Sequence, residues 1–149
     1  MKEHKGFTLV EMIMVIIVLG ILAVTAAPKF LDIQRDARKS TLQGAKSAII
    51  SANSMVYSKA MIEGIEKTSG AIGTIDTIKG NIVMTEENLK KAVMIDMPII
   101  GDDKGANSSG LYIITNDKVT DPEASQCYLM VVNRHDKGEL YFELEDKGC

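Results

Sequence analysis

The sequence has 149 residues, which is the length of one ordinary domain. Its 17 basic and 20 acidic residues give a net charge of −3, and this weak acidity gives no reason to expect a nucleic-acid partner. With only 2 histidines and 2 cysteines, the chain offers no histidine–cysteine metal cluster and argues against nucleophilic catalysis. We therefore expect no catalytic residue, no metal and no cofactor.

Apolar residues are concentrated near the N-terminus. Residues 12–28 carry no charge, whereas residues 1–5 and the chain from Lys29 onward are polar or mixed. The stretch from Phe7 to Pro28 is long enough to cross a hydrocarbon layer of ~30 Å as a helix that rises ~1.5 Å per residue. The sequence therefore predicts a hydrophobic N-terminal helix joined to a more polar remainder.

Three interpretations of this stretch compete. A secretory signal peptide would be cut after small residues such as Ala26 and Ala27, but the apolar core is long and an acid stands at its start. A plain membrane anchor would keep its N-terminus in the cytoplasm, because Lys2 and Lys5 precede the span. The third interpretation gives a function to Glu11, because a carboxylate in an apolar stretch is costly unless it finds a partner.

Residues 5–11 read Lys-Gly-Phe-Thr-Leu-Val-Glu and are followed by the apolar helix. This motif resembles the N-terminus of type IV prepilins, and the short leader and the phenylalanine at the cut resemble the type IVa branch. The resemblance implies that a prepilin peptidase cuts between Gly6 and Phe7, and that the same enzyme methylates Phe7. It also implies that Glu11 is the acidic residue used in assembly.

A second region resembles a particular group of pilins. Residues 20–34, 36–38, 42–44 and 57–60 are similar to pilins of mannose-sensitive haemagglutinin pili. This likeness implies a precursor that spans the inner membrane once, is assembled at an inner-membrane platform and ends as an extracellular homopolymer. Expected roles are surface attachment, biofilm formation and motility, with a surface glycan as the receptor.

The resemblance also divides the chain into segments. The leader would be residues 1–6, the transmembrane and assembly helix residues 7–28, and the globular head residues 29–149. Gly20 and Pro28 have two interpretations, which stay open. Gly20 is a close-packing site, or the helix melts between these two residues when the subunit enters a filament.

The elements of the head follow in chain order. Residues 30–62 predict a continuation of the helix. Apolar residues recur there at steps of three and four and form one face: Leu42, Ala45, Ile49, Ala52, Val56 and Ala60. Residues 64–81 resemble a loop, because they carry several glycines. Thr85 is placed to cap a short helix that reaches about Met94, with acids in its first turn and lysines later.

The remainder of the head predicts strands. Residues 111–114, 128–132 and 140–144 are rich in β-branched and aromatic residues. Residues 136–138, Asp-Lys-Gly, predict a turn between the last two strands and hence an antiparallel hairpin. Residues 101–110 and 116–126 are expected to be polar loops. The fold class is therefore α+β, with the C-terminal half of the long helix packed on a small antiparallel sheet.

The two cysteines, Cys127 and Cys149, suggest one disulfide in a chain with an export-type N-terminus. The alternative is two free thiols in a cytosolic protein. The pilin resemblance adds that such a bond closes a C-terminal loop, which is often exposed on the filament surface.

Other candidate sites are weaker. Asp102, Asp103 and Asn107 offer oxygen ligands for calcium, but no glutamate completes an EF-hand spacing, so a solvated loop is favoured. Asp121 and Glu123 are also interpreted as solvated side chains, and His135 as a turn residue rather than a general base.

Three classes of function remain. The first is a structural subunit of an extracellular filament, either the major pilin or a minor one. The second is a pseudopilin of a type II secretion system, which the paired cysteines disfavour. The third is an unrelated membrane-anchored enzyme or binding domain, which the leader motif and Glu11 disfavour.

Overall fold

The computed structural model describes residues 6–102 and 108–149. The chain divides into two compact units, with the boundary between Ala37 and Arg38. The elements in chain order are α1 (Leu9–Glu63), β1 (Ser69–Ile72), β2 (Ile75–Ile78), β3 (Asn81–Ile82), α2 (Glu86–Ala92), β4 (Ile99–Asp102), β5 (Ser108–Ile114), α3 (Pro122–Ser125), β6 (Tyr128–Arg134) and β7 (Glu139–Glu145).

Helix α1 is the longest element and contributes its second part to the second unit. One face of this part is buried, and its members are the residues that the apolar spacing predicted: Leu42, Ala45, Ile49, Ala52, Val56 and Ala60. Small side chains at three of these positions allow the helix to approach the sheet closely. Gly64, with φ of +74°, follows the last helical residue and supplies the left-handed conformation common after a helix C-terminus.

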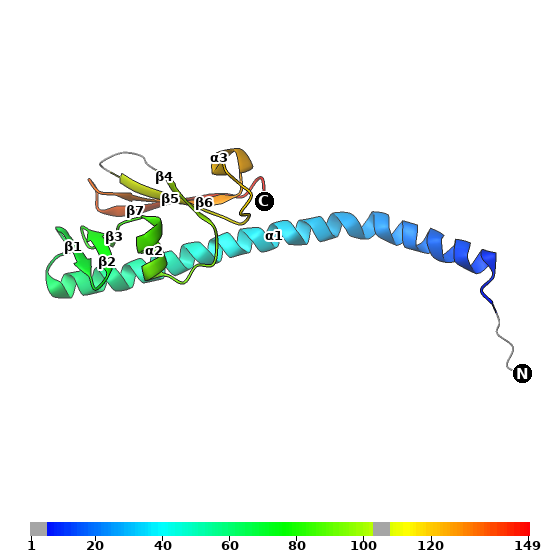
Figure 1. Ribbon diagram of the computed structural model, residues 1–149, viewed down its shortest axis with the longest axis horizontal. Helices are drawn as coiled ribbons and strands as arrows, with labels where there is room; N and C mark the ends of the chain where they lie inside the picture. Colours follow the sequence, from blue (N-terminus) through cyan, green and yellow to red (C-terminus); the bar gives the residue numbers. More distant parts are fainter. Residues whose placement is uncertain (1–5, 103–107) are drawn as a thin grey trace, which may run out of the picture. The chain divides into compact units, whose positions relative to one another are not determined.

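The main sheet has four antiparallel strands in the order β4-β5-β6-β7. Figure 1 shows it lying along the part of α1 that belongs to the second unit. Leu111, Leu129 and Val131 on one side of the sheet join the α1 face in a single core. The α+β class, the predicted strands and the antiparallel hairpin of β6 and β7 are thus confirmed.

The interpretation of residues 64–81 as a loop was wrong. They form β1 and β2 and the start of β3, in a second, three-stranded antiparallel sheet. The glycines that suggested a loop instead make tight turns, since Gly73 and Gly80 have φ of +62° and +73°. Asn53 of α1 fastens this sheet, because its side chain donates to Asn81 Oδ1 at 2.7 Å and accepts the amide of Ile82 at 3.0 Å.

Helix α2 has the predicted cap, since the hydroxyl of Thr85 accepts a hydrogen bond from the amide of Asn88. The Asn88 side chain is buried and bonds to the backbone of Asp76 and Val83. The helix ends at Ala92, slightly before the expected Met94. Lys91 hydrogen-bonds to Glu87 one turn earlier, which lowers the pKa of the Glu87 carboxyl.

Two segments expected to be polar loops contain regular structure. Ile99–Asp102 pairs with β5 as the edge strand β4, and Pro122–Ser125 forms the short helix α3. Asp121 caps α3 by accepting the amide of Ala124 at 3.1 Å, and Glu123 accepts the hydroxyl of Tyr112 at 2.6 Å. Both acids are exposed, as expected, but each also has a structural partner.

Candidate functional site

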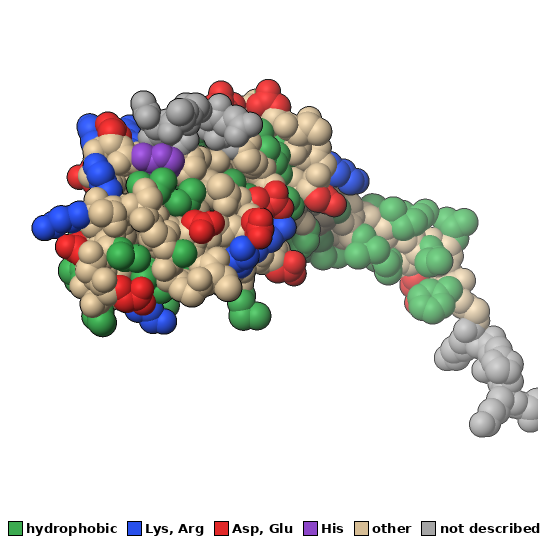
Figure 2. Space-filling model, turned by 60° about the vertical axis from the view of Figure 1, so that its left-hand side comes forward, with side chains coloured by type: hydrophobic (Ala, Val, Ile, Leu, Met, Phe, Trp, Pro, Cys, Tyr) green, Lys and Arg blue, Asp and Glu red, His purple; other side chains and the backbone are tan. Residues whose placement is uncertain are grey.

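The candidate site begins with the apolar part of α1, described within the first unit. Every large apolar side chain from Phe7 to Val24 exposes between 47% and 80% of its surface. Figure 2 shows these side chains covering the N-terminal segment. By length and composition, α1 is a helix that can cross a membrane, with a mean hydropathy of 2.7 in its most apolar window. A helix that is apolar on all sides requires an apolar environment, either lipid or other helices.

Glu11 has a partner within its own chain. Its Oε2 atom accepts the backbone amide of Thr8 at 2.8 Å and the Thr8 hydroxyl at 2.8 Å. In return, the amide of Glu11 donates to the Thr8 hydroxyl oxygen at 3.3 Å. Because α1 begins at Leu9, Thr8 and Glu11 occupy the N-cap and N3 positions, and the reciprocal bonds form a capping box.

Thr8 and its cap were not among the features predicted from the sequence. The spacing Thr-x-x-Glu ahead of an apolar run is the signal that finds it. A carboxylate in the first turn also suits the positive end of the helix dipole. Glu11 is therefore held at the start of α1 by bonds that do not require a charged partner.

The expected cleavage position lies just before the helix. Gly6, Phe7 and Thr8 are not helical, and Phe7 exposes 80% of its surface. A peptide bond outside regular structure is more accessible to a peptidase than one inside a helix. The structure places Gly6 and Phe7 next to the capping box of Thr8 and Glu11, so the residues singled out at the N-terminus share one short segment.

Gly20 and Pro28 both lie inside α1, which continues through them. Pro28 has no amide hydrogen for the carbonyl four residues earlier, so the helix lacks one bond there. The Thr25 hydroxyl donates to the carbonyls of Ile21 and Leu22 at 3.3 and 3.0 Å. A break between Gly20 and Pro28 in the assembled state remains a prediction.

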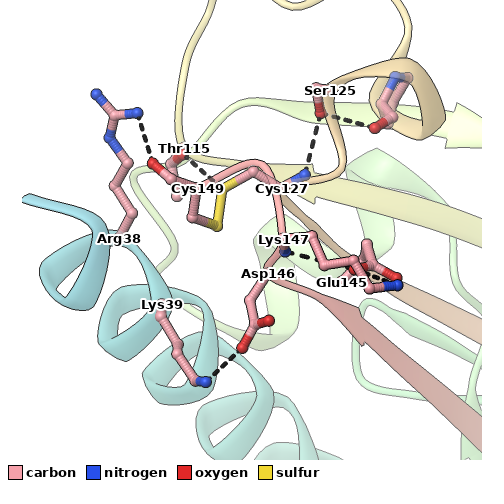
Figure 3. Close-up of a disulfide and its surroundings, with 10 residues drawn as sticks. Arg38, Lys39, Thr115, Ser125, Cys127, Glu145, Asp146, Lys147 and Cys149 are labelled. Carbon is pink, nitrogen blue, oxygen red and sulfur yellow. Dashed lines mark hydrogen bonds and ion pairs between the residues drawn. A yellow bond between two sulfur atoms is a disulfide. The ribbon is translucent and has the colours of Figure 1, made fainter. Parts of the chain in front are cut away.

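The second unit contains a disulfide between Cys127 and Cys149, whose Cα atoms are 4.8 Å apart. Figure 3 shows it at the start of β6, beside residues 146–149 and α1. The amide of Cys127 donates to the hydroxyl of Ser125 at 3.3 Å, and the hydroxyl of Thr115 lies 3.5 Å from the Cys127 sulfur. The bond thus closes a loop that contains the β6–β7 hairpin.

The remaining candidates give no site among the residues that the structure describes. The side chains of Asp102, Asp103 and Asn107, weighed as calcium ligands, lie outside the described residues. In the described parts, no three histidine, cysteine or acidic side chains come together as a metal site. His135 follows β6, with its Nε2 atom 3.2 Å from the hydroxyl of Ser109.

The match to a known protein family concerns the N-terminal region. Residues 1–27 match the family described as the prokaryotic N-terminal methylation motif. The chain is also 40% identical over 48 residues to the type IV narrow pilus major component PilA5 of Thermus thermophilus. This alignment covers 32% of the chain and 41% of that relative, which is less than half of either protein. No solved structure matches the chain significantly.

The motif and the relative support a type IV pilin, a class whose fold agrees with the long helix and small antiparallel sheet described here. The motif and the apolar helix also fit a membrane-anchored precursor that becomes part of an extracellular pilus.

Proposed function

We propose that the chain is a structural subunit of a type IV pilus of the mannose-sensitive haemagglutinin kind. It polymerises with copies of itself into an extracellular filament that serves surface attachment, biofilm formation and motility. The observation that carries the proposal is the apolar helix, exposed on all sides, within a matched methylation motif that also contains the capped Glu11.

Before assembly, the precursor spans the inner membrane once. Lys2 and Lys5 on the N-terminal side favour a cytoplasmic N-terminus, and the head then lies in the periplasm. In this compartment the Cys127–Cys149 disulfide forms under oxidising conditions. Residues 29–149 are the head in this scheme and residues 7–28 the membrane segment.

Processing converts the precursor into an assembly-competent subunit. A prepilin peptidase removes residues 1–6 and methylates the amine of Phe7, which stays cationic. The non-helical backbone at Gly6 and Phe7 supports cleavage there, because no helical hydrogen bond has to be opened first.

Assembly at an inner-membrane platform moves the apolar helix from lipid into a core of stacked helices. Apolar contact supplies most of the association energy. The carboxylate of Glu11 then pairs with the N-terminal amine of a neighbouring subunit, because a charge buried without a partner is expensive. This pairing requires a fixed axial stagger between subunits, so Glu11 sets the register of the filament.

To test the proposal, electron microscopy compares sheared surface material from cells that carry the gene for this chain with material from cells that lack it. Filaments should be present in the first, absent in the second, and should yield peptides of this chain in mass spectrometry. A strain that keeps its filaments but stops secreting proteins across the outer membrane would instead indicate a pseudopilin. Binding of the two strains to a surface coated with glycans then tests the proposed role in attachment.

A further inference from the structure

Residues 146–149, which we call the strap, contact three different elements of the second unit. They follow β7 and lie between the start of α1 in this unit, the end of α3 and the start of β6 (Figure 3). Neither the sequence pattern nor the proposed filament function predicts these contacts.

The contacts with α1 come from two successive cations. Arg38 donates from Nη1 to the carbonyl of Cys149 at 3.0 Å, and the ammonium of Lys39 forms an ion pair with the carboxylate of Asp146. Arg38 is the first residue of the second unit, so both cations lie in the first turn of α1 that belongs to it. Leu42, one turn later, is fully buried and anchors the same stretch in the core.

The strap also lies close to the backbone at the end of α3. The amide of Gly148 donates to the carbonyl of Gln126 at 2.8 Å. A Cβ atom at Gly148 would lie 1.9 Å from the carbonyl oxygen of Ser125, so no larger residue fits without a shift of the backbone. Cys149 then joins Cys127 through the disulfide.

These contacts differ in strength. The side chains of Lys39 and Asp146 are 45% and 34% exposed, and an ion pair so open to solvent contributes little alone. A covalent bond at Cys149 keeps the Cys149 carbonyl and Asp146 close to the two cations, which raises their effective concentration. Without that bond the strap is held by the open ion pair and by single hydrogen bonds from Arg38 and Gly148, and such a partly exposed segment opens readily.

We infer that residues 146–149 form a redox-dependent strap, in which the Cys127–Cys149 disulfide holds the strap against Arg38 and Lys39 and thereby fixes the first turn of α1 in the second unit. The disulfide and the two cations then act as one unit. Losing either loosens residues 38–41, which precede the buried Leu42, and losing both adds nothing further. This coupling holds whether or not the chain forms filaments.

Hydrogen–deuterium exchange with mass spectrometry tests the coupling on the full chain in detergent micelles. The variants are Cys127→Ala/Cys149→Ala, Arg38→Gln/Lys39→Gln and the combination of all four changes. Peptides that cover residues 38–45 report on the strap, and peptides from β5 and β6 report on the folding of the head. Lys59→Gln is the control, because it removes a charge from an exposed position of the same helix.

Each double variant should speed exchange in residues 38–45 by about tenfold, as expected for local opening of one helical turn that has lost its contacts with the strap. The fourfold variant should match the double variants, and Lys59→Gln should match the wild type. Unchanged exchange after loss of the disulfide would overturn the inference, as would effects that multiply in the fourfold variant. Exchange in residues 38–45 that rises only as much as exchange in β5 and β6 would also overturn it, because the effect would then be the lower stability of the whole second unit rather than the opening of one turn.

Discussion

Thr8 donates two hydrogen bonds to a single carboxylate oxygen of Glu11, one from its amide and one from its hydroxyl, each 2.8 Å long. Glu11 therefore has two separable properties. It caps the start of α1, and it carries a negative charge at the N-terminal end of an apolar helix. The first property needs only an acceptor oxygen, which glutamine also supplies at this position of a capping box. The second property needs the ionised carboxylate.

The substitution Glu11→Gln separates these properties. It keeps the cap and the shape of the side chain but removes the charge, so we expect normal processing and few or no pili. Glu11→Ala should also be processed and fail to assemble. Immunoblots of the precursor and mature forms, with electron microscopy of sheared cells, make the comparison.

Thr8→Val is the matched control for the cap. It removes the hydroxyl and keeps the charge of Glu11, so pili should still form although the helix start loses about 1 kcal/mol. Abundant pili from Glu11→Gln would rule out the charge-register mechanism. Unprocessed Glu11→Ala would show that Glu11 serves recognition by the peptidase instead.

Gly6→Val should leave full-length precursor in the membrane. A Cβ atom at Gly6 meets nothing within 4 Å in the folded chain, so the substitution disturbs no packing. The expected effect arises in the peptidase, where a branched side chain next to the cut crowds a narrow active site. Gly44→Val is the control, because Gly44 is equally open and lies far along the helix from the cut. Mature protein from Gly6→Val in normal amount would refute the expected cleavage position.

Loss of the disulfide should destabilise the head. With 22 residues separating Cys127 and Cys149, the chain-entropy view gives about 3 kcal/mol for closing the loop. Cys127→Ser and Cys149→Ser should each lower the free energy of unfolding by a few kcal/mol and reduce subunit levels through proteolysis. Urea titration followed by circular dichroism measures the first effect. If both thiols in untreated filaments react with an alkylating reagent, the bond is absent and the prediction fails.

Asn88→Ala should weaken the second unit by about 1–3 kcal/mol, because it removes the three hydrogen bonds of a buried side chain, although the carbonyls of Asp76 and Val83 still accept the amides of Val83 and Thr85. The side chain donates to the carbonyls of Asp76 and Val83 at 2.8 and 2.9 Å and accepts the amide of Asp76 at 2.8 Å. The same titration measures this loss, with Lys90→Ala on the exposed side of α2 as the control. A change within 0.5 kcal/mol, as is usual for surface positions, would show that solvent replaces these bonds.

The long helix and the β6–β7 hairpin were predictable because their signals are periodic and local. The buried face of α1 follows from the spacing of Leu42, Ile49 and Val56, and the hairpin follows from a turn sequence between two apolar runs. The small sheet of β1–β3 was not predictable, because its strands are short and its glycines are typical of both loops and tight turns. Its stability depends on Asn53 and Asn81, which are 28 residues apart and meet only in the fold.

The candidate site was likewise predictable only where its signal is local in the sequence. Gly6, Phe7 and Glu11 were predicted from a compact motif, and the Thr8 cap has a sequence signal of its own, the spacing Thr-x-x-Glu. The contacts of Arg38 and Lys39 with residues 146–149 had no sequence signal, because the residues involved are separated by more than 100 positions. Such long-range partners depend on the packing of the head rather than on any local pattern.

The most direct test of the proposed function is the N-terminal residue of the protein in purified surface filaments, determined by N-terminal sequencing and intact mass. We predict a chain that begins at methylated Phe7 and keeps the whole apolar helix, since in the proposed assembly that helix lies in the filament core. A chain that begins near Ala27 or Pro28 would contradict the proposal, because it would mean that the helix is a secretory signal peptide and is absent from the mature protein.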